Sequence, residues 1–331
     1  MPFIIKPQLY QRDNNNWFYT LSFDIINLQT IGSYLTIMGF KLFLLLEKIL
    51  MLLPKKMRKN FFTSLAHIAY YASSRYRNIG FINLDFVYKD SISKEEKKNI
   101  IKYSFRNLLL NFLHLMELRH MSKEELERKV TIKNIEAVQK AHKEGKAIIY
   151  ITSHYCAWEL GASVIGNSVE SVYAIFKKMK NLDYQNWVLE SRSKFGNNSL
   201  EKSNVIKPLI KIVKNQQACG ILIDTAINKR EGIEVDFLGK KVHQTATPAY
   251  LARKYNAAII PVSIKTDDEE NYTLIFFDEI EVQKSDDEKE DIRVATQLQT
   301  DWLSKLILDE PKFWFWIHRR FKSSYPQIYK K

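Results

Sequence analysis

From Val130 onward, short apolar runs alternate with longer segments of helical periodicity, and this alternation is the strongest constraint on the fold. Short apolar runs bounded by turn residues predict buried strands. We expect strands at 130–134, 147–152, 171–176, 219–224, 233–237, 257–264 and 272–277, and helices at 135–144, 182–195, 206–216, 248–255 and 291–308. Continuously apolar strands separated by helices predict an α/β domain with a mostly parallel central sheet flanked by helices.

The strand at 147–152 runs into a turn that carries His154, and Glu159 follows five residues later. On one continuous helix these side chains would point about 140° apart, so they can meet only if His154 lies in the loop and Glu159 in the first helical turn. That arrangement suits a histidine base oriented by a carboxylate. The same spacing also occurs as a purely structural pair. We predict no metal site, because His-Glu-x-x-His is absent and Cys156 and Cys219 are far apart.

The segment SHYCAWELG, which carries His154 and Glu159, resembles the His-x4-Asp/Glu block of the lysophospholipid acyltransferase superfamily. Its Trp-Glu-Leu form is most similar to the late (lauroyl or myristoyl) acyltransferases of lipid A biosynthesis. Three further blocks resemble that family in its order, namely ILIDTAINKREGIEVDFLGKKV (221–242), TPAYLARKYNAAIIPVSI (247–264) and FWIHRRFK (315–322). The resemblance therefore spans residues 147–322.

The resemblance implies His154 as the general base and Glu159 as the acid that orients it. Arg192, in ESRSKFG, resembles a basic residue that contacts the acceptor's phosphate, and a planar guanidinium suits phosphate. The family's Tyr-Arg-Pro element is replaced here by YAIFKK, which makes Lys177 and Lys178 further candidates for that anion. Two more acids are candidate substrate-site residues, Asp224 at the end of a buried strand and Glu234 in GIEVDF.

The activity implied is transfer of a fatty acyl chain from acyl carrier protein to a hydroxyl of a Kdo-bearing, phosphorylated lipid A precursor, without a cofactor. The acceptor hydroxyl would attack the thioester directly. Cys156 lies two residues from His154, so an acyl-cysteine route stays open. Two other interpretations also remain, an acyltransferase for a lysophospholipid or another glycolipid and a noncatalytic basic protein that binds membrane or nucleic acid.

The chain is strongly basic, with 50 Lys and Arg against 37 Asp and Glu, a net charge of +13. Such a balance favours an anionic partner, such as an acidic carrier protein or an anionic glycolipid. Nucleic acid is not expected, because no zinc-finger spacing or RNA-recognition motif is present. Two cysteines fit a reducing compartment. We expect the cytoplasmic face of a bacterial inner membrane.

Residues 31–53 form the most apolar segment, long enough to cross a bilayer. Lys41, Glu47 and Lys48 interrupt it, and each costs about 2–3 kcal/mol near the bilayer centre. An interfacial helix, a membrane span and a buried core helix all remain open. Further helices are expected at 61–76 and, from the capping residue Ser93, to about 119. The expected organisation is an extension (1–30), a membrane-associating helix (31–60), a helical cover (61–129), the acyltransferase domain (130–322) and a tail (323–331).

Overall fold

The computed structural model describes residues 25–330, with side chains from Met38 onward. The chain divides into two compact units between Leu46 and Glu47, inside helix α1 (Ile25–Leu52). The expected extension 1–30 therefore lies largely outside the described residues, as does Lys331 of the expected tail. Within the described residues, no helix has the length and apolar character needed to cross a membrane.

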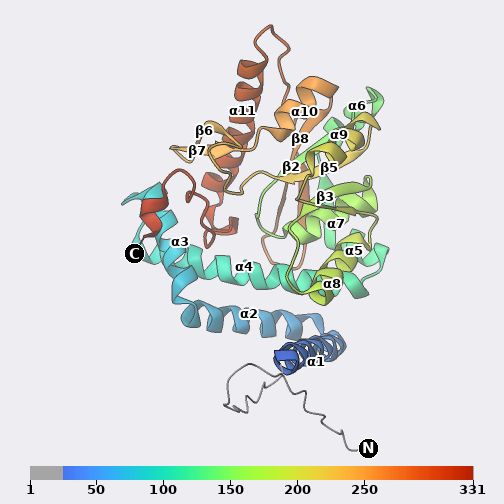
Figure 1. Cartoon of the computed structure of the whole chain (residues 1–331), viewed down its shortest axis with the longest axis vertical. Helices are drawn as coiled ribbons and strands as arrows, with labels where there is room; N and C mark the ends of the chain where they lie inside the picture. Colours follow the sequence, from blue (N-terminus) through green and yellow to red (C-terminus); the bar gives the residue numbers. More distant parts are fainter. Residues whose placement is uncertain (1–24, 331) are drawn as a thin grey trace, which may run out of the picture. The chain divides into compact units, whose positions relative to one another are not determined.

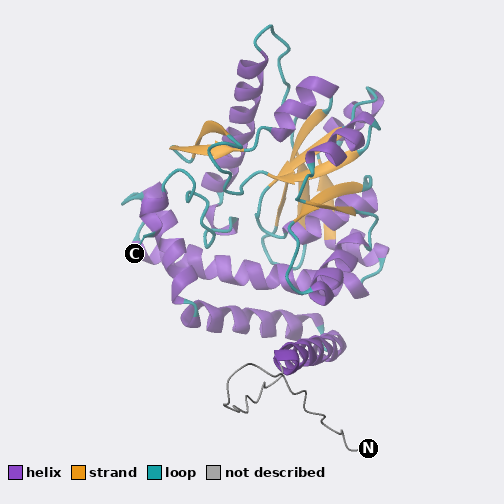
Figure 2. Ribbon diagram, in the orientation of Figure 1, coloured by secondary structure: helices purple, strands orange, loops and turns teal. Residues whose placement is uncertain are grey.

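The second unit is built on a sheet of seven strands in the order β1-β9-β8-β2-β5-β3-β4 (Figure 2). The strands are β1 (Val130–Lys133), β2 (Ile148–Thr152), β3 (Val172–Phe176), β4 (Asn198–Glu201), β5 (Ala218–Leu222), β8 (Ala258–Lys265) and β9 (Tyr272–Phe276). Neighbouring strands are parallel except for β8 and β9. A separate antiparallel hairpin is formed by β6 (Ile233–Phe237) and β7 (Lys240–Gln244).

Helices cover both faces of this sheet (Figure 1). In chain order they are α2 (Lys55–Ala72), α3 (Ser74–Tyr88), α4 (Lys94–His120), α5 (Lys123–Lys129), α6 (Glu136–Lys143), α7 (Trp158–Ser168), α8 (Leu182–Ser193), α9 (Ile206–Lys214), α10 (Thr247–Tyr255) and α11 (Glu288–Asp309), with short 3-10 turns at Pro311–Phe313 and Pro326–Tyr329. Helix α7 packs against β3 and β8, and α10 packs against β2 and β8 from the opposite side. The central strands β2 and β8 are therefore buried on both faces, which explains their continuously apolar sequences.

The α/β fold with a mostly parallel sheet is confirmed. The single helix expected at 61–76 is wrong, because α2 ends at Ala72 and α3 begins at Ser74. Strands β4 and β7 were not expected, since NSLE and KKVHQ are polar sequences at the sheet edge and in a hairpin. The start of α4 is as predicted, with the Ser93 side chain accepting a hydrogen bond from the Glu96 amide.

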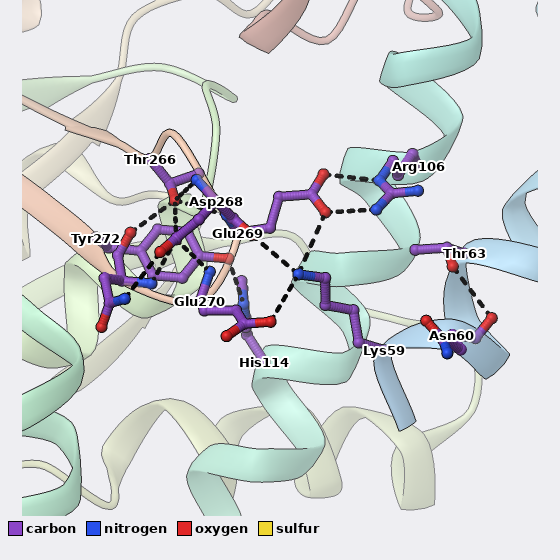
Figure 3. A network of polar contacts seen from close by, with 11 residues as sticks. Lys59, Asn60, Thr63, Arg106, His114, Thr266, Asp268, Glu269, Glu270 and Tyr272 are labelled. Atoms are coloured by element: carbon purple, nitrogen blue, oxygen red, sulfur yellow. Dashed lines mark hydrogen bonds and ion pairs between the residues drawn. The ribbon is translucent and has the colours of Figure 1, made fainter. Parts of the chain in front are cut away.

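Charged side chains join the helical layer to the turn between β8 and β9 (Figure 3). Arg106 of α4 donates to Glu269 through Nε at 2.7 Å and Nη2 at 2.5 Å. Lys59 of α2 donates to the Asp268 carbonyl at 2.9 Å and to Glu270 at 3.2 Å. Below them, the Tyr272 hydroxyl lies 3.2 Å from the buried His114 ring. These contacts fix α2 and α4 against the sheet.

Glu47, one of the charges that interrupt the apolar N-terminal segment, is buried within the second unit. Its carboxylate accepts a hydrogen bond from Trp187 Nε1 at 2.8 Å and lies 3.3 Å from Arg119 and 3.1 Å from His120. A buried carboxylate is tolerated when it is paired and hydrogen-bonded in this way. Glu47 is thus an anchor between the end of α1 and helices α4 and α8.

Candidate active site

The register of two neighbouring strands brings His154 and Asp224 together. Strands β2 and β5 are parallel, and Thr152 lies opposite Leu222 at their carboxyl ends. His154 and Asp224 each follow two residues after those positions. The Ile223 amide still donates to the Thr152 carbonyl at 2.9 Å, so the two chains separate only beyond this point. Both side chains consequently lie at the carboxyl edge of the sheet, where sites of α/β proteins form.

Asp224 is the acid bonded to the histidine. Its Oδ1 lies 2.9 Å from His154 Nδ1, and its Oδ2 accepts the His154 backbone N–H at 2.9 Å. A carboxylate only accepts hydrogen bonds, so Nδ1 carries the proton and the lone pair is on Nε2. No protein group within residues 25–330 hydrogen-bonds to Nε2. The pair therefore presents an oriented imidazole with its basic nitrogen available.

Burial and charge act in opposite directions on both members of this pair. Burial alone lowers the pKa of His154, but the charge and hydrogen bond of Asp224 outweigh it and the pKa is raised above its usual value. Burial alone raises the pKa of Asp224, yet the neighbouring His154 and the hydrogen bonds it donates hold that pKa far below its ordinary range. Asp224 is thus ionised and stabilises the protonated form of His154.

A C-terminal segment, residues 313–321, completes the surroundings of Asp224. Trp314 Nε1 donates to Asp224 Oδ2 at 3.0 Å, and His318 Nε2 lies 3.2 Å from the Asp224 backbone oxygen. The backbone also pairs with the histidine loop, because Phe315 N donates to the His154 carbonyl at 3.1 Å. Trp314 and Trp316 are fully buried, so these two belong to the core.

Helix α4 contributes a row of polar side chains that sequence reasoning missed. Asn111 donates to the Cys156 carbonyl at 2.7 Å and accepts from the Glu159 amide at 3.3 Å. Asn107 and Ser104, on the same face of α4, donate to the backbone of residues 313 and 314. The available signal was their spacing of three and four residues within an otherwise apolar helix face. This row holds the histidine loop and the C-terminal segment in one arrangement.

Glu159 lies in the first turn of α7, as expected, but its carboxylate binds Arg192 of α8. Arg192 Nε donates to Oε2 at 2.9 Å and Nη2 donates to Oε1 at 2.5 Å. Within the described residues there is no hydrogen bond between Glu159 and the His154 ring. Glu159 is near enough for its charge to contribute to the raised pKa of His154. The roles assigned to Glu159 and Arg192 from sequence stay predictions.

The remaining candidates are distributed around the sheet. Lys177 and Lys178 are exposed in the loop after β3. Glu234 is exposed on the β6–β7 hairpin, opposite His243. The side chains of these three residues form no hydrogen bond or salt bridge with other described residues. Their roles in substrate binding are not tested by these positions.

Cys156 is buried beneath the histidine loop. Its backbone adopts a positive φ of 48°, which is uncommon for a residue with a side chain. Burial raises the pKa of its thiol well above the ordinary value, so the thiol stays protonated near neutral pH. Within residues 25–330 there is also no cluster of three or more His, Cys, Asp or Glu that could hold a metal ion.

An apolar cavity lies between α7 and the sheet, beside the histidine. It contains an empty volume of about 970 Å³, part of which is continuous with solvent. Gly161 of α7 and Gly220 of β5 line it, and a Cβ at either position would lie 3.3 Å from a neighbouring side chain, so both glycines leave room. Trp158 and the Glu159–Arg192 pair also line this cavity. The Trp158 ring centroid is 5.4 Å from that of His154.

Comparison with known proteins identifies the family of this chain. The family described as "Bacterial lipid A biosynthesis acyltransferase" matches residues 28–323. The lipid A biosynthesis palmitoleoyltransferase of Escherichia coli (strain K12) is 21% identical over 233 residues, which cover 70% of this chain and 74% of that protein. A lipid A biosynthesis acyltransferase of Shigella flexneri has the same identity and coverage. The chain therefore belongs to the bacterial lipid A biosynthesis acyltransferase family, as the resemblance of its four sequence blocks predicted.

Proposed function

We propose that this acyltransferase moves a fatty acyl chain from the thioester of an acyl carrier protein to a hydroxyl of a Kdo-bearing, phosphorylated lipid A precursor, with His154 as the general base. The observation that carries the proposal is the hydrogen bond from His154 Nδ1 to Asp224, 2.9 Å long. It selects the tautomer whose Nε2 can accept a proton from an incoming hydroxyl. Asp224 serves as the positioning acid.

In the reaction the acceptor hydroxyl gives its proton to His154 Nε2 while its oxygen attacks the thioester carbonyl carbon. The tetrahedral intermediate then breaks the carbon–sulfur bond, and the imidazolium returns the proton to the leaving thiolate. The products are the new ester and the free thiol of the carrier. Asp224 stabilises the transient imidazolium, which is consistent with the raised pKa of His154.

Direct attack by the acceptor is favoured over an acyl-cysteine intermediate. A cysteine nucleophile reacts as its thiolate, and the burial of Cys156 opposes thiolate formation. Its backbone carbonyl is also held by Asn111, and its amide donates to the Phe313 carbonyl at 3.0 Å. Cys156 thus acts in this proposal as a packed structural residue of the histidine loop.

The apolar cavity beneath α7 accommodates the acyl chain in this proposal. Its lining is mostly apolar with a few polar groups, as in sites that bind small molecules. In this proposal the acyl chain passes Trp158 as it enters the cavity, and the Glu159–Arg192 pair lies there, next to the reacting thioester. The charge of Glu159 then helps to raise the pKa of His154. Glu159 also holds Arg192 at the entrance of the cavity, where the N–H groups of Arg192 that are not bound to Glu159 can meet the substrate.

The basic charge of the chain supports the proposed substrates and the proposed location of the reaction. A net charge of +13 suits both an acidic carrier protein and a phosphorylated acceptor. Lys177, Lys178 and Glu234 remain candidates for contacts with these substrates because all three are exposed. The acceptor is a membrane lipid and the donor is a cytoplasmic protein, so the reaction takes place at the cytoplasmic face of the inner membrane.

The test supplies membranes containing the full chain with acyl carrier protein loaded with chains of several lengths and a tetra-acylated lipid A precursor, and product masses are read. We expect one added acyl group, lost in His154→Ala and retained in His142→Ala. His142 is an exposed histidine paired with Glu170, which makes it a matched control. Acylation of a lysophospholipid instead of the precursor would replace the proposed acceptor. Turnover that survives in His154→Ala would contradict the proposed base.

A further inference from the structure

A second cavity lies near the histidine, between the end of α2, the start of α3, helix α4 and the C-terminal segment. We call it the α3–α4 groove. Its lining is mainly apolar and includes Ile79, Phe105, Leu108, Leu109, Phe315 and Ile317. Two basic residues, Arg75 and Arg319, also line it. An apolar surface bordered by cations fits an amphiphile that carries both acyl chains and a negative charge.

The groove lies close to His154, and two of its lining residues are neighbours of that ring. Phe315 and His318 line the groove, and their rings are stacked at a centroid distance of 5.7 Å. The His154 ring centroid is 6.1 Å from that of Phe315 and 6.3 Å from that of His318. The apolar cavity beneath α7 reaches His154 past Trp158 instead. The apolar cavity thus meets the surroundings of the histidine at Trp158 and the groove meets them at Phe315, two rings whose centroids are 6.2 Å apart. A transfer reaction needs room for two substrates at such a place.

Among the described residues, the two arginines of the groove have no acidic partner, in contrast to several other arginines of this unit. Arg58, Arg106 and Arg192 each donate to a carboxylate. Arg75 and Arg319 are exposed and have no carboxylate within ion-pair distance among the described residues. Each guanidinium lies over a tyrosine ring, Arg75 at 5.9 Å from Tyr76 and Arg319 at 5.6 Å from Tyr329.

This environment suits an anionic ligand. An arginine stacked on an aromatic ring is partly fixed, while the N–H groups at its edge stay available for two-point hydrogen bonding to phosphate.

We infer that the α3–α4 groove binds the acceptor, a phosphorylated glycolipid, with an acyl chain along its apolar lining and a phosphate between Arg75 and Arg319. This inference deepens the proposed function and rests on it. It gives the acceptor an entrance separate from that of the acyl donor. It also assigns phosphate recognition to two arginines without acidic partners, whereas Arg192 is already bound to Glu159.

The experiment compares Arg75→Gln, Arg319→Gln and the double variant with wild type, measuring initial rates of acyl transfer against each substrate separately. We expect the KM for the phosphorylated acceptor to rise about tenfold for each substitution, because each removes charge-assisted hydrogen bonds. The KM for acyl carrier protein should be unchanged. Arg293→Gln, which removes the same charge from an exposed ion pair on α11, is the matched control and should leave both values unchanged.

A second substrate identifies what the arginines recognise. An acceptor from which one phosphate has been removed should bind wild type more weakly, whereas the double variant should no longer discriminate between the two acceptors. Leu108→Gln, at an exposed position of the apolar lining, should raise the acceptor KM without affecting the phosphate dependence.

Three outcomes would overturn the inference. One is an unchanged acceptor KM in the double variant, and another is a rise in the donor KM, which would assign the arginines to the carrier protein. The third is equal competition by phosphatidylglycerol dispersed in the same detergent, which would mean that the groove takes any anionic lipid.

Binding of the phosphorylated acceptor to the His154→Ala protein is measured as well. If wild type transfers no acyl group but the lipid binds in an Arg75- and Arg319-dependent way, the proposed function is contradicted, whereas the assignment of the α3–α4 groove as a lipid-binding site is supported.

Discussion

Two buried carboxylates lie close to the same histidine, and their partners differ. Asp224 accepts hydrogen bonds from the His154 ring, the His154 amide and the Trp314 indole, and no Lys or Arg of the described residues donates to it. Glu159 is bound at two points by Arg192. An arginine stays protonated at any accessible pH, so the charge of Glu159 is largely compensated in both states of the reaction. The partner of Asp224 is itself the base, so the charge of Asp224 is felt most strongly when His154 becomes protonated.

The comparison shows that distance along the sequence does not identify the acid that works with a histidine. Glu159 is five residues from His154, and Asp224 is seventy residues away. Glu159, the acid nearer to the histidine in the sequence, is hydrogen-bonded to Arg192 and not to the histidine. Four experiments test this difference, in order of decreasing expected effect.

Asp224→Asn should lower kcat by about 10⁴-fold, the loss seen when the acid of a histidine pair is neutralised with its shape retained. The amide can present an N–H to Nδ1, which favours the tautomer without a lone pair on Nε2. Acyl transfer by purified protein measures this, with thermal unfolding as a check of folding. Asp236→Asn, which removes an exposed carboxylate paired with Lys241, is the control. A loss of less than tenfold would mean that Asp224 is not the positioning acid.

Glu159→Gln should lower kcat by only about tenfold, because it removes a charge that Arg192 already compensates. The larger effect is on stability, a loss of about 1–3 kcal/mol, because Arg192 keeps its charge without its partner at a partly buried site. Adding Arg192→Met should recover part of that loss, measured by denaturant unfolding. If Glu159→Gln inactivates the enzyme as severely as Asp224→Asn, the sequence-based assignment of Glu159 as the orienting acid holds.

Trp314→Phe should lower kcat several-fold while leaving both KM values unchanged, because it removes one hydrogen bond to Asp224 and retains most of the packing. Trp316→Phe is a close control, since that indole is equally buried but donates to the Pro311 carbonyl at 2.7 Å. Equal effects of the two substitutions would indicate that Trp314 only fills space. A selective effect of Trp314→Phe supports a positioning role.

The pH dependence should give the smallest but most specific signal. The reaction needs neutral His154, and the pKa of His154 is raised, so activity should fall as the pH decreases through a value above the ordinary histidine pKa of about 6.5. Asp224→Asn removes the charge that raises this pKa, so the acid limb of its residual activity should move to lower pH. Trp314→Phe should move the limb in the opposite direction, because an Asp224 with fewer donors stabilises the imidazolium more. An identical acid limb in all three proteins would mean that another group titrates.

Much of this arrangement could be predicted because it depends on local patterns. The apolar runs that became β2 and β8 and the capping residue of α4 were all readable, and so was the turn that carries His154. Where local patterns were weak the predictions were wrong or missing, as for the break at Ser73 and the polar strand β4. The sequence also indicated that Asp224 needed a partner, because a buried carboxylate is costly, but it did not indicate which one.

By itself the sequence determined the fold class, the family and the position of His154 at the end of a buried strand, because periodicity and short motifs are properties of neighbouring residues. Only the tertiary structure decided which acid meets the histidine. That choice depends on the register of β2 and β5, which puts Thr152 opposite Leu222. It depends equally on the C-terminal segment, which brings Trp314 to Asp224 across ninety residues of chain. Such contacts are fixed by the packing of distant segments, and no local pattern encodes them.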